Sequence, residues 1–152
     1  MAELDEKDLK IMEVLKNNSR LSSQQISKTT AIPITTVHNR IKKLEKSGII
    51  RKYTVVFDNK KLGKNLSAYI LTTVDYAGLK KEKMFQDELA RRIRNLPLVE
   101  QVSILAGQVD LLIRVSTSDI NALNRFIIRE LRNIPGIDRT QTLIVLEDLA
   151  DN

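Results

Sequence analysis

Apolar residues recur every three or four positions through the first third of the chain, which is the period of amphipathic helices. Asp5 is the predicted N-cap of a first helix, with Asp8 in the reciprocal position of a capping box. Leu4 and Leu9 flank this cap at the spacing of a hydrophobic staple. We expect the helix to run to about residue 16. Its inner face is predicted to carry Ile11, Met12 and Leu15.

A shorter second helix is predicted to follow. Ser22 is its expected N-cap and Gln25 the reciprocal capping-box residue, so the helix begins with two satisfied backbone N–H groups. It is expected to end near Thr29, and residues 30–32 are expected to make a tight turn. The pattern therefore predicts a helix pair with a short connection.

The third helix has a clear apolar stripe but an ambiguous start. Pro33 or Ile34 begins it if the turn is tight, although a proline side chain cannot accept a capping hydrogen bond and costs about 1 kcal/mol against a good cap. Thr35 is an alternative cap, and both starts stay open. Gly48 is predicted to end the helix. The buried stripe is expected at Val37, Ile41 and Leu44.

The segment 49–57 is rich in β-branched and aromatic residues and predicts a strand. Residues 58–65 are polar, basic and turn-prone, which is typical of a boundary between domains. We therefore divide the chain into a helical domain at 1–57, a linker at 58–65 and a second domain at 66–152.

The second domain alternates predicted strands and helices in the order β-α-β-β-α-β. Strands are expected at residues 66–74, 99–105, 110–116 and 139–147. One helix is expected over 80–95, and another after Ser118 as its cap. Their inner faces are predicted to carry Phe85, Leu89, Ile93 and Leu96 in the first and Leu123, Ile127, Leu131 and Ile134 in the second. This order is that of the ferredoxin-like split βαβ unit, so the predicted fold class is α+β.

Such a unit covers only one face of its sheet with helices, and the other face of an antiparallel sheet is ordinarily polar. Here the strands are apolar on both faces, at Ile70, Leu71, Val74, Leu111, Leu112, Ile113, Leu143, Ile144, Val145 and Leu146. We therefore expect the uncovered face to pack on another copy of the chain, in a homodimer or a larger assembly.

Charge is distributed unevenly along the 152 residues, whose formal net charge is +6. Residues 20–64 hold eleven Lys and Arg against two acidic residues, a net of 11 − 2 = +9. Residues 65–152 hold eleven against twelve, a net of 11 − 12 = −1. This asymmetry favours a local site for a polyanion.

Composition excludes several classes of site. The chain has no cysteine and one histidine, which argues against disulfides and a transition-metal site. Its start lacks the basic flank and apolar run of a signal peptide, and no apolar run approaches the roughly 20 residues that span a bilayer. We expect a cytoplasmic protein with no membrane partner, no cofactor and no metal.

The helix pair, its turn and the charge maximum together predict a helix-turn-helix that places its second helix in the DNA major groove. Short polar side chains near the start of that helix suit base edges, and its cations suit phosphates or, for an arginine, a guanine edge. A solvated basic helix face is the alternative. The predicted DNA-binding residues are Arg20, Ser22, Ser23, Ile34, Thr35, Thr36, His38, Asn39, Arg40, Lys42 and Lys43.

Nearly the whole chain resembles the Lrp/AsnC (feast/famine) family of prokaryotic transcription regulators. The resemblance rests on an ordered set of motifs: Leu4-Asp5-x-x-Asp8 with Ile11 and Leu15, Asn18-x-Arg20, Thr36-Val37-x-x-Arg40-Ile41-x-x-Leu44-Glu45-x-x-Gly48-Ile49-Ile50, Gly107-x-x-Asp110-Leu111-Leu112 and Pro135-Gly136-Ile137-x-x-Thr140-x-Thr142. It implies a winged or plain helix-turn-helix, an effector domain that pairs the chains, and assembly into octamers or other multiples of dimers. Nucleoid-associated binding to pseudo-palindromic sites is the implied activity.

The resemblance also implies amino-acid effectors, bound between dimers near the loop that starts at Gly107. The matching positions are Gly107, Gln108, Asp110, Leu112, Thr140 and Thr142. The Asp110 carboxylate suits an α-ammonium group. Purely structural explanations stay open, with Gly107 serving a turn and Asp110 capping it.

Two other classes of function are weighed against a sequence-specific regulator. An architectural DNA-compacting protein would bind mainly through phosphates, with little preference between sequences. An enzyme built on the ferredoxin-like unit finds no support, because the sequence offers no nucleophile-base set, no glycine-rich phosphate loop and no paired carboxylates at helical spacing in a plausible cleft. We predict a regulator and not an enzyme.

Overall fold

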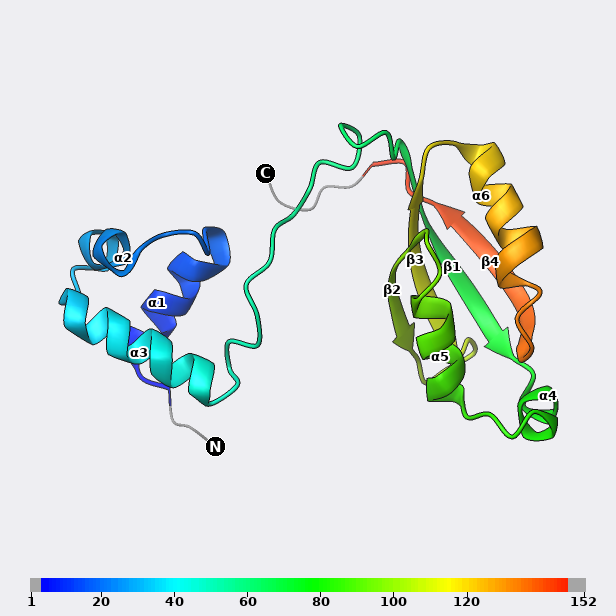
Figure 1. Ribbon diagram of the computed structural model, residues 1–152, viewed down its shortest axis with the longest axis horizontal. Coiled ribbons are helices and arrows are strands. Elements are labelled where there is room, and N and C mark those ends of the chain that lie inside the picture. The colour runs from blue at the N-terminus through cyan, green and yellow to red at the C-terminus, as the bar shows by residue number, and fades with distance from the viewer. Residues whose placement is uncertain (1–3, 148–152) are drawn as a thin grey trace. The chain divides into compact units, whose positions relative to one another are not determined.

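The computed structural model describes residues 4–147 and divides into two compact units, with the division between Val56 and Phe57 (Figure 1). Residues 148–152 lie outside the described part, as do residues 1–3, which belong to the start in which we predicted no signal peptide. Within residues 4–147, no helix is both long enough and apolar enough to cross a membrane.

The first unit consists of three helices: α1 (Glu6–Asn17), α2 (Ser23–Thr30) and α3 (Ile34–Lys46). Both predicted capping boxes are formed, with Asp5 and Asp8 at the start of α1 and Ser22 and Gln25 at the start of α2. The three helices pack around a small aliphatic core of Ile11, Leu15, Ile26, Ile32 and Val37, with Ile41 partly buried against it.

The start of α3 is resolved in favour of the tight turn. Pro33 occupies the N-cap position and makes no side-chain capping bond, so Thr35 lies inside the helix. The turn is closed by Ala31, which adopts a left-handed conformation with φ of +57°. The hydroxyl of Ser27 donates to the carbonyl oxygen of Ile32 over 2.6 Å and holds the turn against α2. At the other end Gly48, with φ of +74°, follows the helix as predicted.

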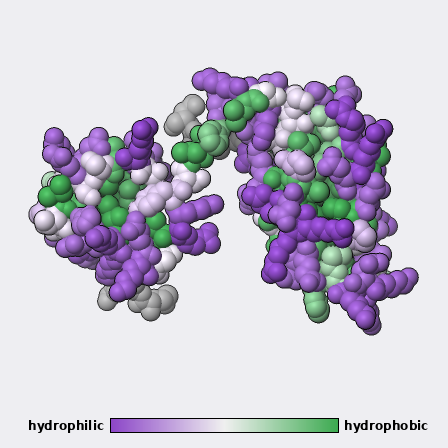
Figure 2. Space-filling model, viewed as in Figure 1, coloured by the Kyte–Doolittle hydropathy of each residue, from purple (hydrophilic) through white to green (hydrophobic). Residues whose placement is uncertain are grey.

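The strand predicted over residues 49–57 is wrong. Residues 51–57 have no regular secondary structure, because none of the strands in the described chain pairs with them and a lone strand leaves its ladder groups to water. Their apolar side chains are exposed, with Val56 at 96% and Phe57 at 66%, and the apolar end of the segment shows green in Figure 2. The Tyr53 hydroxyl donates to Glu45 Oε1 over 2.8 Å and ties the segment to the end of α3.

The second unit is a four-stranded antiparallel sheet in the order β2-β3-β1-β4, which is the split βαβ arrangement. Its α6 continues into a π-helical turn, η1. The elements are β1 (Leu66–Val74), α4 (Tyr76–Lys81), α5 (Gln86–Arg94), β2 (Val99–Ile104), β3 (Leu111–Thr117), α6 (Ile120–Phe126), η1 (Ile127–Leu131) and β4 (Ile137–Ile144).

The single helix predicted over 80–95 is also wrong, because the chain breaks between α4 and α5. Lys83 takes a left-handed conformation with φ of +53°. Its N–H donates to Lys80 O over 3.2 Å, and that of Met84 to Leu79 O over 3.0 Å. These are the two bonds of a Schellman cap, whose left-handed position is usually glycine. Phe85, predicted to point inward, is the N-cap of α5 and is 73% exposed.

The second helical segment differs from its prediction at the cap and in its π-helical second half, η1. Asp119, not Ser118, accepts from the N–H of Ala122 over 2.9 Å, and the Ser118 hydroxyl donates to Asp119 Oδ2. The predicted inner stripe of Leu123, Ile127, Leu131 and Ile134 is buried throughout. The strand at Leu66–Val74 has the predicted bounds, and the fourth strand begins two residues earlier and ends three earlier than predicted.

Helices α5 and α6 cover one face of this sheet (Figure 1), and the core lies between them and the strands. Strand residues that face this core include Ala68, Ile70, Val74, Leu111, Ile113 and Val115. The opposite face carries two apolar cross-strand pairs, Leu71 with Leu112 and Tyr69 with Leu143. The guanidinium of Arg114 lies 5.8 Å from the centre of the Tyr69 ring on the same face.

Residues 58–64 fold onto the second unit. The Asn59 amide donates to Glu100 Oε1 over 3.1 Å and to the hydroxyl of Ser116 over 3.3 Å. Part of the segment that we predicted as a linker at 58–65 therefore contacts the second unit.

Candidate nucleic-acid interface and effector region

Helix α3 has one buried and one exposed side. Val37 and Leu44 are 0% and 1% exposed, and Val37 packs in the core cluster with residues of α1 and α2. The exposed side carries most of the residues that we predicted to contact DNA: Ile34, Thr35, His38, Asn39, Lys42 and Lys43. Short polar groups lie toward the helix start and lysines farther along, so the side offers hydrogen-bond groups for base edges beside cations for phosphates.

The remaining predicted contacts lie around the start of α2 and on the border of the α3 face. Arg20 is exposed, and Ser23 and Thr36 are partly exposed. The Ser22 hydroxyl already accepts from the N–H of Gln25 over 3.3 Å, so its lone pair serves the helix cap first.

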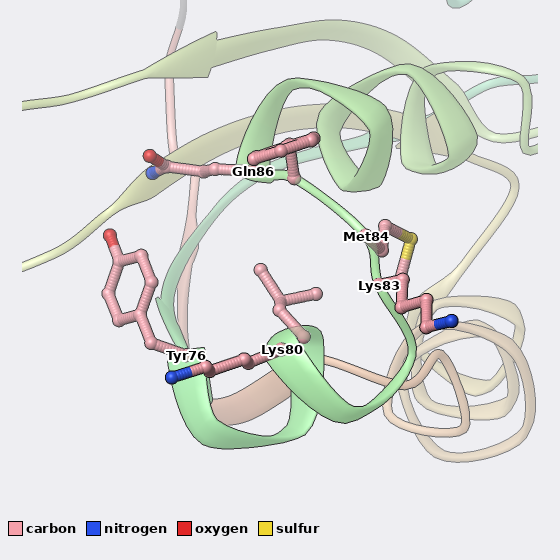
Figure 3. A pocket seen from close by; sticks show the side chains of 7 residues that line it. Tyr76, Lys80, Lys83, Met84 and Gln86 are labelled. Carbon is pink, nitrogen blue, oxygen red and sulfur yellow. The ribbon is translucent and has the colours of Figure 1, made fainter.

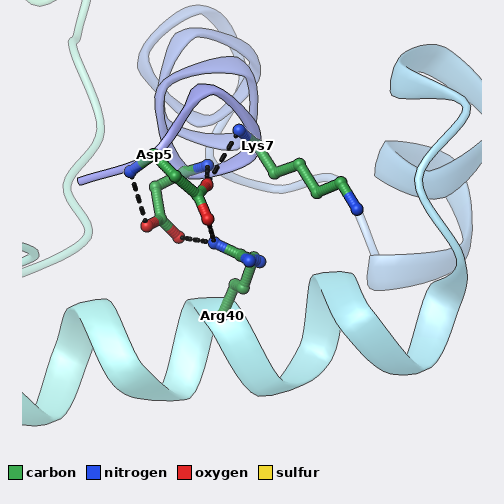
Figure 4. Close-up of polar contacts among 4 residues, drawn as sticks. Asp5, Lys7 and Arg40 are labelled. Carbon is green, nitrogen blue, oxygen red and sulfur yellow. Dashed lines mark hydrogen bonds and ion pairs between the residues drawn. The ribbon is translucent and has the colours of Figure 1, made fainter. Parts of the chain in front are cut away.

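Arg40 is a predicted contact whose guanidinium is bound by two carboxylates of its own unit (Figure 4). Its Nη1 lies 2.6 Å from Asp5 Oδ2 and 2.9 Å from Asp8 Oδ1, and these three side chains form what we call the charged cluster. The Asp8 side chain is 1% exposed and its other oxygen accepts from the N–H of Asp5 over 3.2 Å. The expectation of a phosphate-binding arginine is therefore revised: Arg40 joins α3 to the start of α1.

Proton equilibria within the charged cluster follow from these contacts. The N–H of Asp8 and then the Arg40 guanidinium hold the pKa of Asp5 below its usual range. The two carboxylates, Asp8 first, raise the pKa of Arg40 above its already high value. Asp5 and Arg40 therefore both stay charged at neutral pH.

In the second unit, Asp110 lies at the end of the β2–β3 loop and is held by β1 and α4. Its Oδ2 accepts from the N–H of Val74 over 2.9 Å, and its Oδ1 from the Tyr76 hydroxyl over 2.6 Å. Its own N–H donates to Thr72 O. The same contact with Asp110 raises the pKa of Tyr76. Both carboxylate oxygens thus have donors from the end of β1 and the start of α4, and not from the turn at Gly107.

The other predicted effector residues do not gather around Asp110. Gly107 and Gln108 are exposed in the same loop, and Leu112 lies on the uncovered sheet face. Thr140 and Thr142 pair with Thr72 and Ile70, so they lie on β4 with β1 between them and β3. The Thr140 hydroxyl accepts from Arg132 Nε over 2.9 Å. None of the six positions lines the cavity described next.

A cavity that sequence reasoning missed lies beside this loop, at the break between α4 and α5 (Figure 3). Its volume is about 510 Å³. We call it the α4–α5 pocket, and it is lined by Tyr76, Leu79, Lys80, Lys83, Met84, Phe85 and Gln86. The N-cap residue Asp75, whose side chain accepts from the N–H of Gly78, was the one signal that a helix begins this early.

Gly136 supports the pocket from behind. It has φ of +97°, and a Cβ atom added there would collide with the side chain of Leu79, which lines the pocket, and would touch Leu89. Its carbonyl oxygen accepts from the N–H of Asp75 over 2.9 Å, so the turn before β4 is joined directly to the start of α4.

Comparison with known proteins assigns both units. Residues 4–51 match a winged helix-turn-helix DNA-binding model, and residues 77–152 match the Lrp/AsnC ligand binding domain. An uncharacterized HTH-type transcriptional regulator of Pyrococcus horikoshii is 39% identical over 141 residues, covering 93% of this chain and 91% of that protein. The chain belongs to the Lrp/AsnC family. This Lrp/AsnC protein is thus a transcriptional regulator with a DNA-binding and a ligand-binding domain, as the motifs predicted.

Solved Lrp/AsnC structures share the fold over nearly the whole chain. A transcriptional regulator of Neisseria meningitidis, solved as a complex with L-Met, aligns with a TM-score of 0.88 at 28% identity, over 98% of this chain and 94% of that one. AsnC of E. coli aligns with a TM-score of 0.82 at 25% identity, over 99% of this chain and 97% of that one. These likenesses confirm the α+β fold class.

Proposed function

We propose that this protein regulates transcription inside a prokaryotic cell by binding pseudo-palindromic DNA sites as a homo-oligomer, and that a small molecule modulates the binding. The observation that carries the DNA part is the exposed side of α3. It combines short polar groups and lysines on a helix that two buried residues, Val37 and Leu44, hold in place. A helix presented in this way suits the major groove.

Each side chain of this face has a distinct role in the proposal. Thr35, His38 and Asn39 contact base edges and set the preferred sequence. Lys42 and Lys43 neutralise phosphates and supply affinity without sequence preference. Arg40 touches no phosphate, because two carboxylates bind it, and it acts as a positioning residue for α3.

Pairing of chains is proposed through the uncovered face of the sheet. The pairs Leu71 with Leu112 and Tyr69 with Leu143 make a central apolar patch there, which a second copy would remove from water. A two-fold pair presents two copies of α3, and this symmetry matches a pseudo-palindromic site. Octamers or other multiples of dimers, which the family resemblance implies, belong to the same proposal.

The effector is proposed to be an amino acid or a related small molecule that binds the second unit. Support comes from the match of residues 77–152 to a ligand binding domain and from the relative that was solved with L-Met. We propose no catalytic role for the chain.

Footprinting on genomic fragments, selected by binding to the full-length protein, tests the DNA proposal. We expect discrete protected sites with two-fold symmetry, and light scattering after size-exclusion chromatography should show an even number of chains. Protection spread evenly over any DNA would instead favour the architectural alternative and overturn site-specific regulation.

Matched variants separate the two kinds of contact. Asn39→Ala should relax the preference for the selected site, whereas Lys42→Gln or Lys43→Gln should weaken binding to all DNA and reduce the slope of log affinity against log salt by about 1. Lys81→Gln, in the second unit, is the charge-matched control and should change neither quantity.

A further inference from the structure

We propose that the α4–α5 pocket binds a small organic carboxylate that has an apolar chain and no ammonium group. The inference rests on the proposed function only for its consequence, modulation of DNA binding. Binding itself is argued from the pocket.

The apolar part of the ligand is set by the size and walls of the pocket. A volume of about 510 Å³ lies within the range of small-molecule sites. Leu79 and Met84 line it, and Phe85 stands at its edge with 73% of its surface exposed. An exposed aromatic ring next to a buried leucine leaves apolar surface in water, and an apolar chain of the ligand would cover that surface.

The polar end of the ligand is set by the side chains on one side of the pocket. Figure 3 shows the Tyr76 hydroxyl, the Gln86 amide and the Lys80 ammonium on the same side, with Met84 opposite. The Tyr76 hydroxyl donates to Asp110 Oδ1 over 2.6 Å and the Gln86 amide donates to Asp110 O over 3.5 Å. The Lys80 ammonium is therefore the main donor for a carboxylate, because charge-assisted hydrogen bonds are the strongest available.

An amino acid fits this pocket less well than its deaminated counterpart. The lining includes two lysines, Lys80 and Lys83, and none of the seven lining residues is acidic. Asp110 does not line the pocket but is bound to its lining residue Tyr76. Its carboxylate oxygens already accept from the Tyr76 hydroxyl and from the N–H of Val74. An α-ammonium group would therefore face cations without a free anionic partner.

One backbone feature and one side-chain contact distinguish the α4–α5 connection from an ordinary one. Lys83 occupies a left-handed position that glycine usually fills, and strained non-glycine residues of this kind concentrate at functional sites. The Tyr76 hydroxyl joins the pocket to the β2–β3 loop through Asp110. A ligand carboxylate that accepts from the Tyr76 hydroxyl would remove this donor from Asp110. Binding in the pocket would therefore change the contacts of the β2–β3 loop.

Isothermal titration of the full-length protein with hexanoate, methyl hexanoate and hexylamine tests the ligand class. We expect hexanoate to bind and the ester and the amine to bind about tenfold more weakly or not at all, since each lacks the negative charge. 4-Methyl-2-oxopentanoate should likewise bind more tightly than leucine, its amino-acid counterpart. Equal binding of hexylamine and hexanoate, or tighter binding of leucine, would overturn the proposal.

Variants locate the site. Lys80→Gln should weaken hexanoate binding about tenfold, and Phe85→Ala should weaken it by loss of apolar contact, whereas the neighbouring Lys81→Gln is the control and should leave it unchanged. Lys80, Lys81 and Phe85 are all exposed, so these changes leave the core intact. Unchanged affinity in Lys80→Gln would contradict the assignment.

Failure here is distinguishable from failure of the proposed function. If hexanoate and the oxo acid do not bind while footprints persist, the pocket proposal falls and the regulator stands. If Phe85→Ala changes the number of chains in light scattering and hexanoate does not bind, the pocket is an interface between copies, which also overturns the proposal.

Discussion

The two units of this protein are each stabilised by a different kind of internal contact. The second unit has one continuous cluster of buried apolar residues that runs from the sheet into α5 and α6. The first unit has six buried apolar side chains among residues 4–56, five of them in one cluster, and it also contains the charged cluster of Asp5, Asp8 and Arg40. Small domains bury a smaller share of their surface, so such a unit depends more on individual contacts. The unit that touches DNA is thus the more easily perturbed one.

The largest expected effect on stability comes from replacing a fully buried isoleucine by alanine in each unit. Ile26→Ala in the first and Ile93→Ala in the second each remove a side chain that is 0% exposed, at a cost of about 2–5 kcal/mol. Thermal unfolding followed by circular dichroism should show the first unit lost at ordinary temperatures in Ile26→Ala and the second still folded in Ile93→Ala. Equal losses in both would show that the units do not differ in this way.

Breaking the charged cluster should have the next largest effect. Arg40→Gln leaves the nearly inaccessible Asp8 carboxylate without its cation, so it should lower the melting temperature of the first unit more than Asp8→Asn does. The double variant should recover part of the loss. DNA affinity should fall in Arg40→Gln while its salt slope stays at the wild-type value, because a positioning residue releases no counterion from DNA. A slope reduced by about 1 would instead make Arg40 a phosphate ligand.

Two aspartate N-caps, Asp5 in the first unit and Asp119 in the second, allow the stability of the two units in acid to be compared. Hydrogen bonds from the N–H of Asp8 and from Arg40 lower the pKa of Asp5, and those from the N–H of Ala122 and from Ser118 lower the pKa of Asp119. A folded pKa below the unfolded one adds stability that is present above the unfolded pKa and is lost as the pH falls through the folded pKa.

Asp5→Asn and Asp119→Asn should therefore each reduce the dependence of unfolding on pH in the acid range. Salt of about 1 M should shrink the Asp5 contribution, which includes an exposed ion pair, and leave that of Asp119, whose main partners are uncharged. Chemical denaturation at several pH values measures both. An equal response to salt would contradict the assigned causes.

The smallest effects are expected at the helix starts of the helix-turn-helix. Ser22→Ala removes a capping bond and should cost the first unit about 1 kcal/mol. Pro33→Ser adds a capping side chain to α3, which stabilises the folded state, but it also raises the conformational entropy of the unfolded chain. These opposing changes should leave stability within about 0.5 kcal/mol of the wild type. Denaturant titration of both variants checks the ranking. A large loss in Pro33→Ser would show that the rigid proline, not helix capping, sets the start of α3.

Local signals explain what the sequence could predict. The capping boxes at Asp5 and Ser22 and the glycine at position 48 have short-range causes, and the structure forms all three. The segment 49–57 has strand propensity, but a strand needs a partner, and none of the strands within residues 4–147 pairs with it. The helix break at Lys83 could not be predicted, because the left-handed position that ends a helix is usually a glycine and here it is a lysine.

The candidate sites show the same division. The exposed face of α3 follows from helical periodicity alone, so most of its residues could be named in advance. The partner of Arg40 could not, because Asp8 is 32 residues away and an arginine bound to a buried carboxylate looks the same in a sequence as a free one. The α4–α5 pocket depends on the unpredicted helix break and therefore had no sequence signal of its own.

Gly136 gives the second unit an indirect route for changing specificity over evolutionary time. A side chain at this position would push Leu79, and with it one wall of the α4–α5 pocket, without altering any residue that lines the pocket. Two relatives with identical lining residues could thus differ in the ligands that they accept. A survey of such relatives that compares only lining residues would overlook the position that separates them.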